Sequence, residues 1–556
     1  MKTNEPLFCL IIMLLGTGTP TFLPAQDATG SWSAMEFAQR GKVRSESGAL
    51  DGAMADLNRA LELDPKYATA YVLRGNVKIA NGDFAGAVAD ANEAIRLDPT
   101  LTIAYSLRGN ARQKQGDLDG AAADASKAIS LDPRGTLAYV IRANARLSQH
   151  DLAGASADAM RALELNPQDP LAHALSGMTK MNKGDLDGAV AQFTRAIELN
   201  PKLADAYLER ARAEHTAGHT AAALADATQA IALEPKPTKA LLIRGALKMS
   251  ANDFAGARSD LDRAITLYSQ SVTAYEYRGQ IRIGQGDLAG ALADLDRAIE
   301  LDPKDVSAFS NRAKIHRNKG DLPGALADYA RVIELDPKLG TAWVGRGNVR
   351  LVQGDLVGAL ADMNRAVELD PNDSVARRGR GMVEGRKGDL ETARSDFDRA
   401  IALDPSNADA YAERAAARLM REDAEGAISD LSEAIRLNPK TTKFYAGRGL
   451  ARLKAHKETD GAIEDFTRAI ELSPTSAEFQ YYLGMARTVQ LDFPGAIAAY
   501  SRAIELNPRY IAAFQMRSKA RMVTKDFDGA IADNLRAMEL SRSPTPAPPG
   551  GPEPAK

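Results

Sequence analysis

The chain has 556 residues, of which 70 are Lys or Arg and 73 are Asp or Glu, so its formal net charge is −3. Proteins that bind nucleic acid through electrostatic attraction usually carry a basic excess gathered on one face, and this balanced composition argues against a nucleic-acid partner. The single cysteine, Cys9, excludes disulfides within the chain and metal sites built from several thiolates.

Residues 1–25 have the layout of a secretory signal peptide. Lys2 precedes an apolar run over residues 7–15, and small and turn-forming residues follow up to Ala25. The run is too short to span a bilayer comfortably, so we expect no membrane span in the mature chain and a periplasmic or secreted location. An uncleaved membrane-associating segment, or the disordered start of a cytoplasmic protein, is the alternative. Residues 26–31 would form a short linker.

The sequence from residue 32 to residue 542 is periodic. The tripeptide Leu-Asp-Pro, or a close variant of it, returns every 34 residues, with one extra residue between Lys454 and Asp460. A fixed period of this length indicates one supersecondary unit that is copied and stacked. About fifteen units fill this range and leave no room for a catalytic domain. We therefore predict a protein that is not an enzyme and that uses no cofactor and no metal.

One unit, residues 68–101, shows how each copy should fold. Its first half has apolar residues at helical spacing, and Gly82 ends this first helix because glycine accepts the left-handed conformation common at helix C-termini. Asp83 is placed to cap the amides of a second helix, and Pro99 prevents that helix from continuing. Ala87 belongs to a column that is Ala in all units, and such small side chains let two helices approach closely.

These residues resemble the tetratricopeptide repeat, through Ala-Tyr-x-x-Arg-Gly-Asn, then Gly-Asp-Phe-x-Gly-Ala, then Ala-Ile-x-Leu-Asp-Pro. The resemblance covers about nine-tenths of the chain. It implies an all-α fold, a right-handed superhelical solenoid of about fifteen 34-residue helix-turn-helix repeats whose first helices line a concave groove. It also implies a non-catalytic scaffold that binds proteins or peptides, because most members of the family without an attached domain do so.

Two columns of the repeats hold opposite charges sixteen residues apart. The residue before the small first-helix column is usually Arg, and Asp follows sixteen residues later. Ser176 with Gln192, and Leu483 with Ala499, replace both members together, which indicates an ion pair inside one helix pair. Structural ion pairs repeat and an active site does not, so we interpret them as structural. Representative pairs are Arg74 with Asp90, Arg108 with Asp124, Arg278 with Asp294, and Arg346 with Asp362.

Candidate ligand-binding residues stand where the repeats differ, on the first-helix face expected to be exposed to the groove. Three asparagines lie at 34-residue intervals, and their amides can bond the backbone of an extended peptide. Two methionines and an arginine follow; methionine adapts to irregular partners, and the arginine suits a ligand carboxylate. Solvated amides left by recent duplication, ordinary helix packing and a solvated surface are the alternatives. The candidates are Asn76, Asn110, Asn144, Met178, Met181 and Arg212.

The C-terminal end of the repeats has no polar capping helix after Leu540, and residues 543–556 form a Pro-rich tail that should be disordered. The outermost face of a stack has no neighbour to cover it, so self-association through the last repeat is an expectation. The leading hypothesis is an exported scaffold for protein or peptide partners. The alternatives are a structural subunit of an envelope assembly or polymer-export machine, and a cytosolic adaptor.

Overall fold

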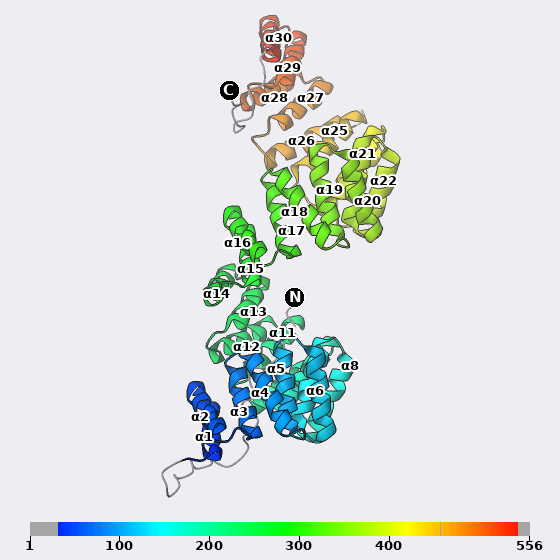
Figure 1. Ribbon diagram of the computed structural model, residues 1–556. Helices are drawn as coiled ribbons and strands as arrows, with labels where there is room; N and C mark the ends of the chain where they lie inside the picture. The colour runs from blue at the N-terminus through cyan, green and yellow to red at the C-terminus, as the bar shows by residue number, and fades with distance from the viewer. Residues whose placement is uncertain (1–31, 456–457, 543–556) are drawn as a thin grey trace. The chain divides into compact units, whose positions relative to one another are not determined.

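The computed structural model describes residues 32–455 and 458–542, which form thirty α-helices and no strand (Figure 1). The helices belong to two compact units; the first ends at Leu301 and the second begins at Asp302. The predicted signal peptide, linker and tail lie outside the described residues. None of the described helices combines the length and the apolar composition needed to cross a membrane.

The first unit contains eight helix pairs, each made of an odd-numbered first helix and an even-numbered second helix. Their bounds are α1 Ala34–Glu46, α2 Leu50–Leu63, α3 Ala68–Ala80, α4 Phe84–Leu97, α5 Thr102–Lys114, α6 Leu118–Leu131, α7 Thr136–Ser148, α8 Leu152–Leu165, α9 Pro170–Asn182, α10 Leu186–Leu199, α11 Ala204–Thr216, α12 Thr220–Leu233, α13 Thr238–Ser250, α14 Phe254–Leu267, α15 Val272–Gly284 and α16 Leu288–Leu301.

The second unit contains seven helix pairs of the same kind. Their bounds are α17 Val306–Asn318, α18 Leu322–Leu335, α19 Gly340–Gln353, α20 Leu356–Leu369, α21 Ser374–Lys387, α22 Leu390–Leu403, α23 Ala408–Met420, α24 Ala424–Leu437, α25 Thr442–Lys454, α26 Thr459–Leu472, α27 Ala477–Val489, α28 Phe493–Leu506, α29 Ile511–Val523 and α30 Phe527–Arg542.

Within each unit, every helix packs against the helix before it and the helix after it, and first helices of neighbouring repeats also touch. Such stacking buries a continuous core although each repeat contacts only its neighbours. The predicted all-α solenoid of about fifteen helix-turn-helix repeats is therefore confirmed.

The turn inside each repeat follows from two residues. Gly82 has a φ of 79°, in the left-handed region that favours glycine. Asp83 then accepts a hydrogen bond on Oδ1 from the amide of Gly86 at 2.8 Å, which caps α4. Five repeats hold a residue other than glycine at the left-handed position, and these are His150, Asn252, Glu422, Leu491 and Lys525.

Columns of small residues set the distance between helices. The second-helix alanine column, which includes Ala87, is completely buried in all fifteen repeats. In the first-helix column, a Cβ added to Gly75 would lie 2.5 Å from a methyl carbon of Leu107, and one added to Gly484 would lie 2.5 Å from the ring of Tyr500. These contacts are too close for a larger side chain. The small residues therefore permit close packing both within a helix pair, as at Gly484, and between neighbouring repeats, as at Gly75.

Candidate functional site

The Arg–Asp pairs lie inside individual helix pairs. Arg278 donates from Nη2 to Oδ1 of Asp294 at 2.6 Å, and the Asp294 side chain is only 3% exposed. The hydrogen bond to Asp294, helped by a second one to Asp262, raises the pKa of Arg278 although burial opposes this. The other representative pairs have N–O distances of 2.7, 2.6 and 2.7 Å for Arg74–Asp90, Arg108–Asp124 and Arg346–Asp362.

A second cation, one turn after the arginine, contacts the same carboxylate in many repeats. Arg282 Nη1, for example, lies 2.7 Å from Oδ2 of Asp294. The repeat of Asp226 differs, because Glu214 stands at the position of the second cation. Arg210, whose Nη2 lies 2.7 Å from Oδ1 of Asp226, is therefore the cation on which Asp226 depends. Each buried carboxylate held in this way is paired with cations of its own helix pair, as Asp294 is with Arg278 and Arg282.

The same arginine also reaches back to the preceding repeat. Nη1 of Arg278 donates to Asp262 at 2.7 Å, and Nη1 of Arg74 donates to Asn58 at 2.9 Å. This contact was not predicted from the sequence, although a column of short polar residues signals it. The acceptors are Asn58, Asn92, Ser126, Thr194, Thr228, Asp262, Asn364, Asp398, Ser432 and Ser501.

The three candidate asparagines lie on α3, α5 and α7, the first helices of successive repeats, which contact one another in that order. Asn76 is half-buried, whereas Asn110 is 4% exposed and Asn144 is 0% exposed. The expectation that this column is exposed is therefore wrong for Asn110 and Asn144. The side chains of these helices pack tightly here, and α5 and α7 bury most of their residues.

Several buried atoms of side-chain amides on these helices make no hydrogen bond with the described part of the chain. They are the Oδ1 of Asn110, both polar atoms of the Asn144 amide, and both polar atoms of the Gln113 amide. Gln113 lies one turn after Asn110 on α5 and is 5% exposed. An unsatisfied buried polar group costs about 1–3 kcal/mol, which a hydrogen-bonding ligand would recover.

The remaining candidates already have contacts within the chain. Met178 and Met181 on α9 are partly buried and pack against the apolar core of that region. Nη1 of Arg212 donates to Oε2 of Glu209 at 2.8 Å, one turn earlier on α11, and Glu209 is 1% exposed. Lys239 Nζ lies 3.8 Å from the same carboxylate. A ligand carboxylate at Arg212 would therefore compete with Glu209.

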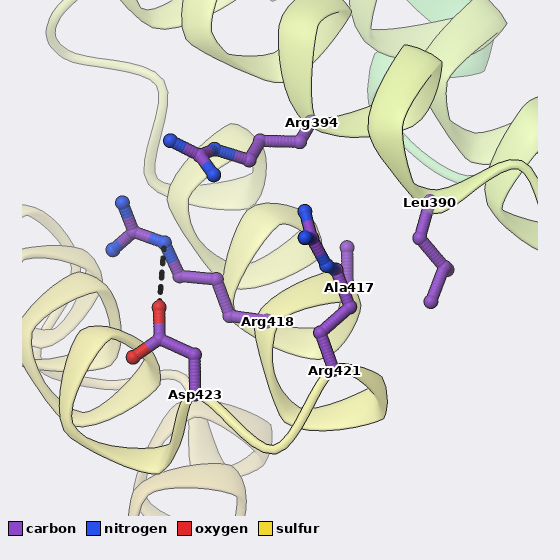
Figure 2. A pocket seen from close by; sticks show the side chains of 6 residues that line it. All are labelled: Leu390, Arg394, Ala417, Arg418, Arg421 and Asp423. Carbon is purple, nitrogen blue, oxygen red and sulfur yellow. Dashed lines mark ion pairs between the residues drawn. The ribbon is translucent and has the colours of Figure 1, made fainter.

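A small cavity of about 130 Å³ lies between α22 and α23 in the second unit (Figure 2). Three arginines line it, and each is matched with a carboxylate: Arg418 with Asp423 at 3.6 Å, Arg394 with Asp398 at 3.7 Å, and Arg421 with Glu391. Each arginine that lines the cavity is therefore already paired with a carboxylate and is not left unpaired for a bound anion. Across residues 32–455 and 458–542, no three His, Cys, Asp or Glu side chains gather as a metal site.

Models of a known repeat family match most of the chain. A tetratricopeptide repeat model matches residues 106–170, 175–240, 244–306, 310–374, 378–441 and 447–511. A TPR repeat model matches residues 41–82, and a further tetratricopeptide repeat model matches residues 68–101. No curated protein matches the chain.

The chain is also similar to several solved structures. The APC/C hetero-tetramer Cut9–Hcn1 is 15% identical, with a TM-score of 0.46, and the match covers 81% of this chain and 96% of that one. A tetratricopeptide repeat protein from Parabacteroides merdae is 22% identical, with a TM-score of 0.39 and coverages of 45% and 98%. YrrB, described as a TPR protein with an unusual peptide-binding site, is 27% identical, with a TM-score of 0.28 and coverages of 32% and 92%.

Proposed function

We propose that this chain, which belongs to the tetratricopeptide repeat family, is a non-catalytic scaffold that binds an extended segment of another protein along α5 and α7. The observation that carries the proposal is a set of buried amide atoms that make no hydrogen bond within the described chain, namely Oδ1 of Asn110 and both polar atoms of Gln113 and Asn144. The general role, a scaffold for protein interaction, rests on the family alone, because tetratricopeptide repeats form such scaffolds.

The chemistry of these amides fits a peptide backbone. Each amide offers a donor and an acceptor, as a peptide group does. Hydrogen bonds shielded from water are electrostatically stronger than exposed ones. Because these amides are closed to solvent, a ligand reaches them only when α5 and α7 move apart, and an extended segment needs a smaller opening than a folded domain. Val140 and Leu147, 1% and 7% exposed, lie one turn before and one turn after Asn144, so we expect apolar, uncharged ligand side chains.

The proposed location is periplasmic or secreted, supported by the sequence pattern of residues 1–25. In that setting the partner would be an envelope or exported protein. The alternative function is that of a structural subunit of an envelope assembly or polymer-export machine. N-terminal sequencing of the chain purified from its native host tests this location. A mature chain that begins near residue 26 supports export, and an intact Met1 contradicts it.

The binding proposal is tested with a peptide selected from a random library on the wild-type protein. Fluorescence anisotropy then compares the wild type with the double variant Asn110→Ala, Asn144→Ala. Loss of two amides, at about 1 kcal/mol for each hydrogen bond, should weaken binding at least tenfold.

The matched control for this experiment is Asn348→Ala. Asn348 is half-buried at the equivalent position of α19 in the second unit. We expect it to leave the affinity unchanged. Circular dichroism must show that all variants keep their helix content. Failure to select any peptide, or equal affinity of the double variant and the wild type, contradicts the proposal.

A further inference from the structure

The last helix is α30, which is labelled in Figure 1. One of its faces carries an exposed apolar stripe. Ile531, Leu535 and Met538 are 57%, 57% and 56% exposed. An apolar stripe at helical spacing is typical of a face that packs against another helix. The other face of α30 is buried and packs on α29; its buried residues are Ala530, Asp533, Ala537 and Leu540.

In earlier repeats the equivalent positions pack against the next repeat. Ile428 and Ile435 of α24 correspond to Ile531 and Met538, and they belong to one apolar cluster with Phe444 of α25. No described helix follows α30. The stripe is thus an inter-repeat packing surface that ends in solvent, and large exposed apolar patches of this kind mark interaction sites.

We propose that this stripe pairs with the same stripe of a second copy, with the two α30 helices antiparallel. Asp528, Ile531, Leu535, Met538 and Arg542 recur at alternating intervals of three and four residues, the spacing of a helix–helix seam. Leu535 is the centre of this pattern. Antiparallel pairing about it sets Asp528 of each copy opposite Arg542 of the other, and places Ile531 within one residue of the level of Met538.

Such a stripe is self-complementary in charge as well as in shape, which a two-fold symmetric interface requires. Asp528 and Arg542 are exposed, and neither makes an ion pair with another residue of the described chain. Both are therefore free to pair across the dimer. The two interactions would lie at the ends of the seam and would fix the helix direction, because a parallel arrangement would place like charges together.

A head-to-tail contact between α30 and α1 of another copy fits less well. Within the solenoid the first-helix arginine donates to a polar acceptor on the preceding second helix, as Arg74 does to Asn58. The equivalent acceptor position in α30 holds Leu535, so Arg40 of an incoming α1 would find no partner there. Head-to-tail contacts would also produce growing chains rather than closed pairs.

Sedimentation velocity of the full chain over a concentration series tests the proposal. One pair of helices is a small interface, so we expect a reversible shift from monomer to dimer as concentration rises. Leu535→Asp should remain monomeric across the same range. Asp528→Arg and Arg542→Asp, each alone, should weaken the dimer roughly tenfold, and the double variant should restore it.

Val357→Asp is the control, because Val357 is an 81% exposed apolar residue on α20, away from the stripe; this variant should dimerise like the wild type. Leu535 is mostly exposed, so its substitution should not disturb folding, which circular dichroism verifies. A wild type that stays monomeric, a dimer that survives Leu535→Asp, a series of larger species, or no restoration in the charge-swap variant would each overturn the proposal. The experiment contains no peptide, so its outcome is separate from that of the proposed peptide binding.

Discussion

Second-helix aspartates are the residues on which several helices of the solenoid converge. Asp294 accepts hydrogen bonds from Arg278 and Arg282 of its own repeat, and Arg278 also binds Asp262 of the preceding repeat. Each such carboxylate is almost fully buried. Burial of a charge is costly unless it is paired and hydrogen-bonded, so the number of cations around each aspartate should decide how sensitive a repeat is to substitution.

We expect Arg210→Ala to destabilise the protein more than Arg278→Ala. Arg210→Ala leaves Asp226 without a cation from its own repeat, whereas Asp294 keeps Arg282 at 2.7 Å. Removing one partner of a buried ion pair costs about 3 kcal/mol, and a retained second cation should reduce that loss. Urea unfolding followed by circular dichroism measures the difference in midpoint. Equal midpoints for the two variants would contradict this account.

Asp260 should make the stability depend on acid pH. Burial acts to raise its pKa, but hydrogen bonds from Arg244 and Lys248 outweigh burial and hold the pKa below the ordinary 3.8. Because the pKa is lower in the folded state, the contribution of Asp260 is complete above pH 3.8 and is lost as the pH falls through the folded-state value.

The variant Asp260→Asn tests that dependence. At pH 7 it should unfold at a lower urea concentration than the wild type. Between about pH 5 and about pH 2 it should lose less of its remaining stability, because the titrating group is absent. If the two proteins lose stability in parallel over this range, Asp260 does not carry the effect.

At the scale of single elements, the turn between the helices of a repeat offers a stabilising substitution. Leu491 has a φ of 66°, so its backbone is in the left-handed region, and its side chain is 71% exposed. A side chain in that region costs about 1–2 kcal/mol, and Leu491→Gly should therefore stabilise the protein by about 1 kcal/mol. Thermal unfolding measures the gain.

The control for this substitution is Lys519→Gly. Lys519 is exposed inside α29, where glycine should cost about 1 kcal/mol because it weakens a helix interior. Opposite signs for the two glycine substitutions support the left-handed turn. Destabilisation by both would show that Leu491 makes contacts which outweigh its backbone strain.

Most of the elements could be predicted from local chemistry, and contacts between elements could be predicted only in part. Gly82, Asp83 and Pro99 mark the ends of α3 and α4 in the sequence, and the structure ends both helices beside them. The burial of Asn144 depends on tertiary packing that no local pattern reveals. The Arg212–Glu209 contact was open to prediction, because residues three apart on a helix are neighbours.

At the scale of the whole molecule, the repeat period predicted the fold class but not the division of the helices into two units. The 34-residue period continues from Leu301 to Asp302 without an insertion, so nothing in it marks that division. Each repeat contacts only its neighbours, and a local defect should therefore stay local.

Gly484→Ala should create such a local defect. The added Cβ would lie 2.5 Å from the ring of Tyr500, and overpacking of this kind costs about 1–3 kcal/mol. Hydrogen exchange should become faster in α27–α30 and stay unchanged in α1–α16. Gly284→Ala is the control, because nothing lies within 4 Å of its added Cβ. Uniformly faster exchange along the chain would contradict the prediction.

Most repeats carry an arginine that donates to the preceding repeat and a polar acceptor for the arginine of the following repeat. A duplicated copy inserted between two such repeats finds matching chemistry on either side, so the array can lengthen by gene duplication without new adaptation at the join. Met160 before Ser176, Ala330 before Arg346, and Thr467 before Leu483 lack the matched pair of an acceptor and an arginine. We therefore expect the array to lengthen less readily at these three joins than at the others.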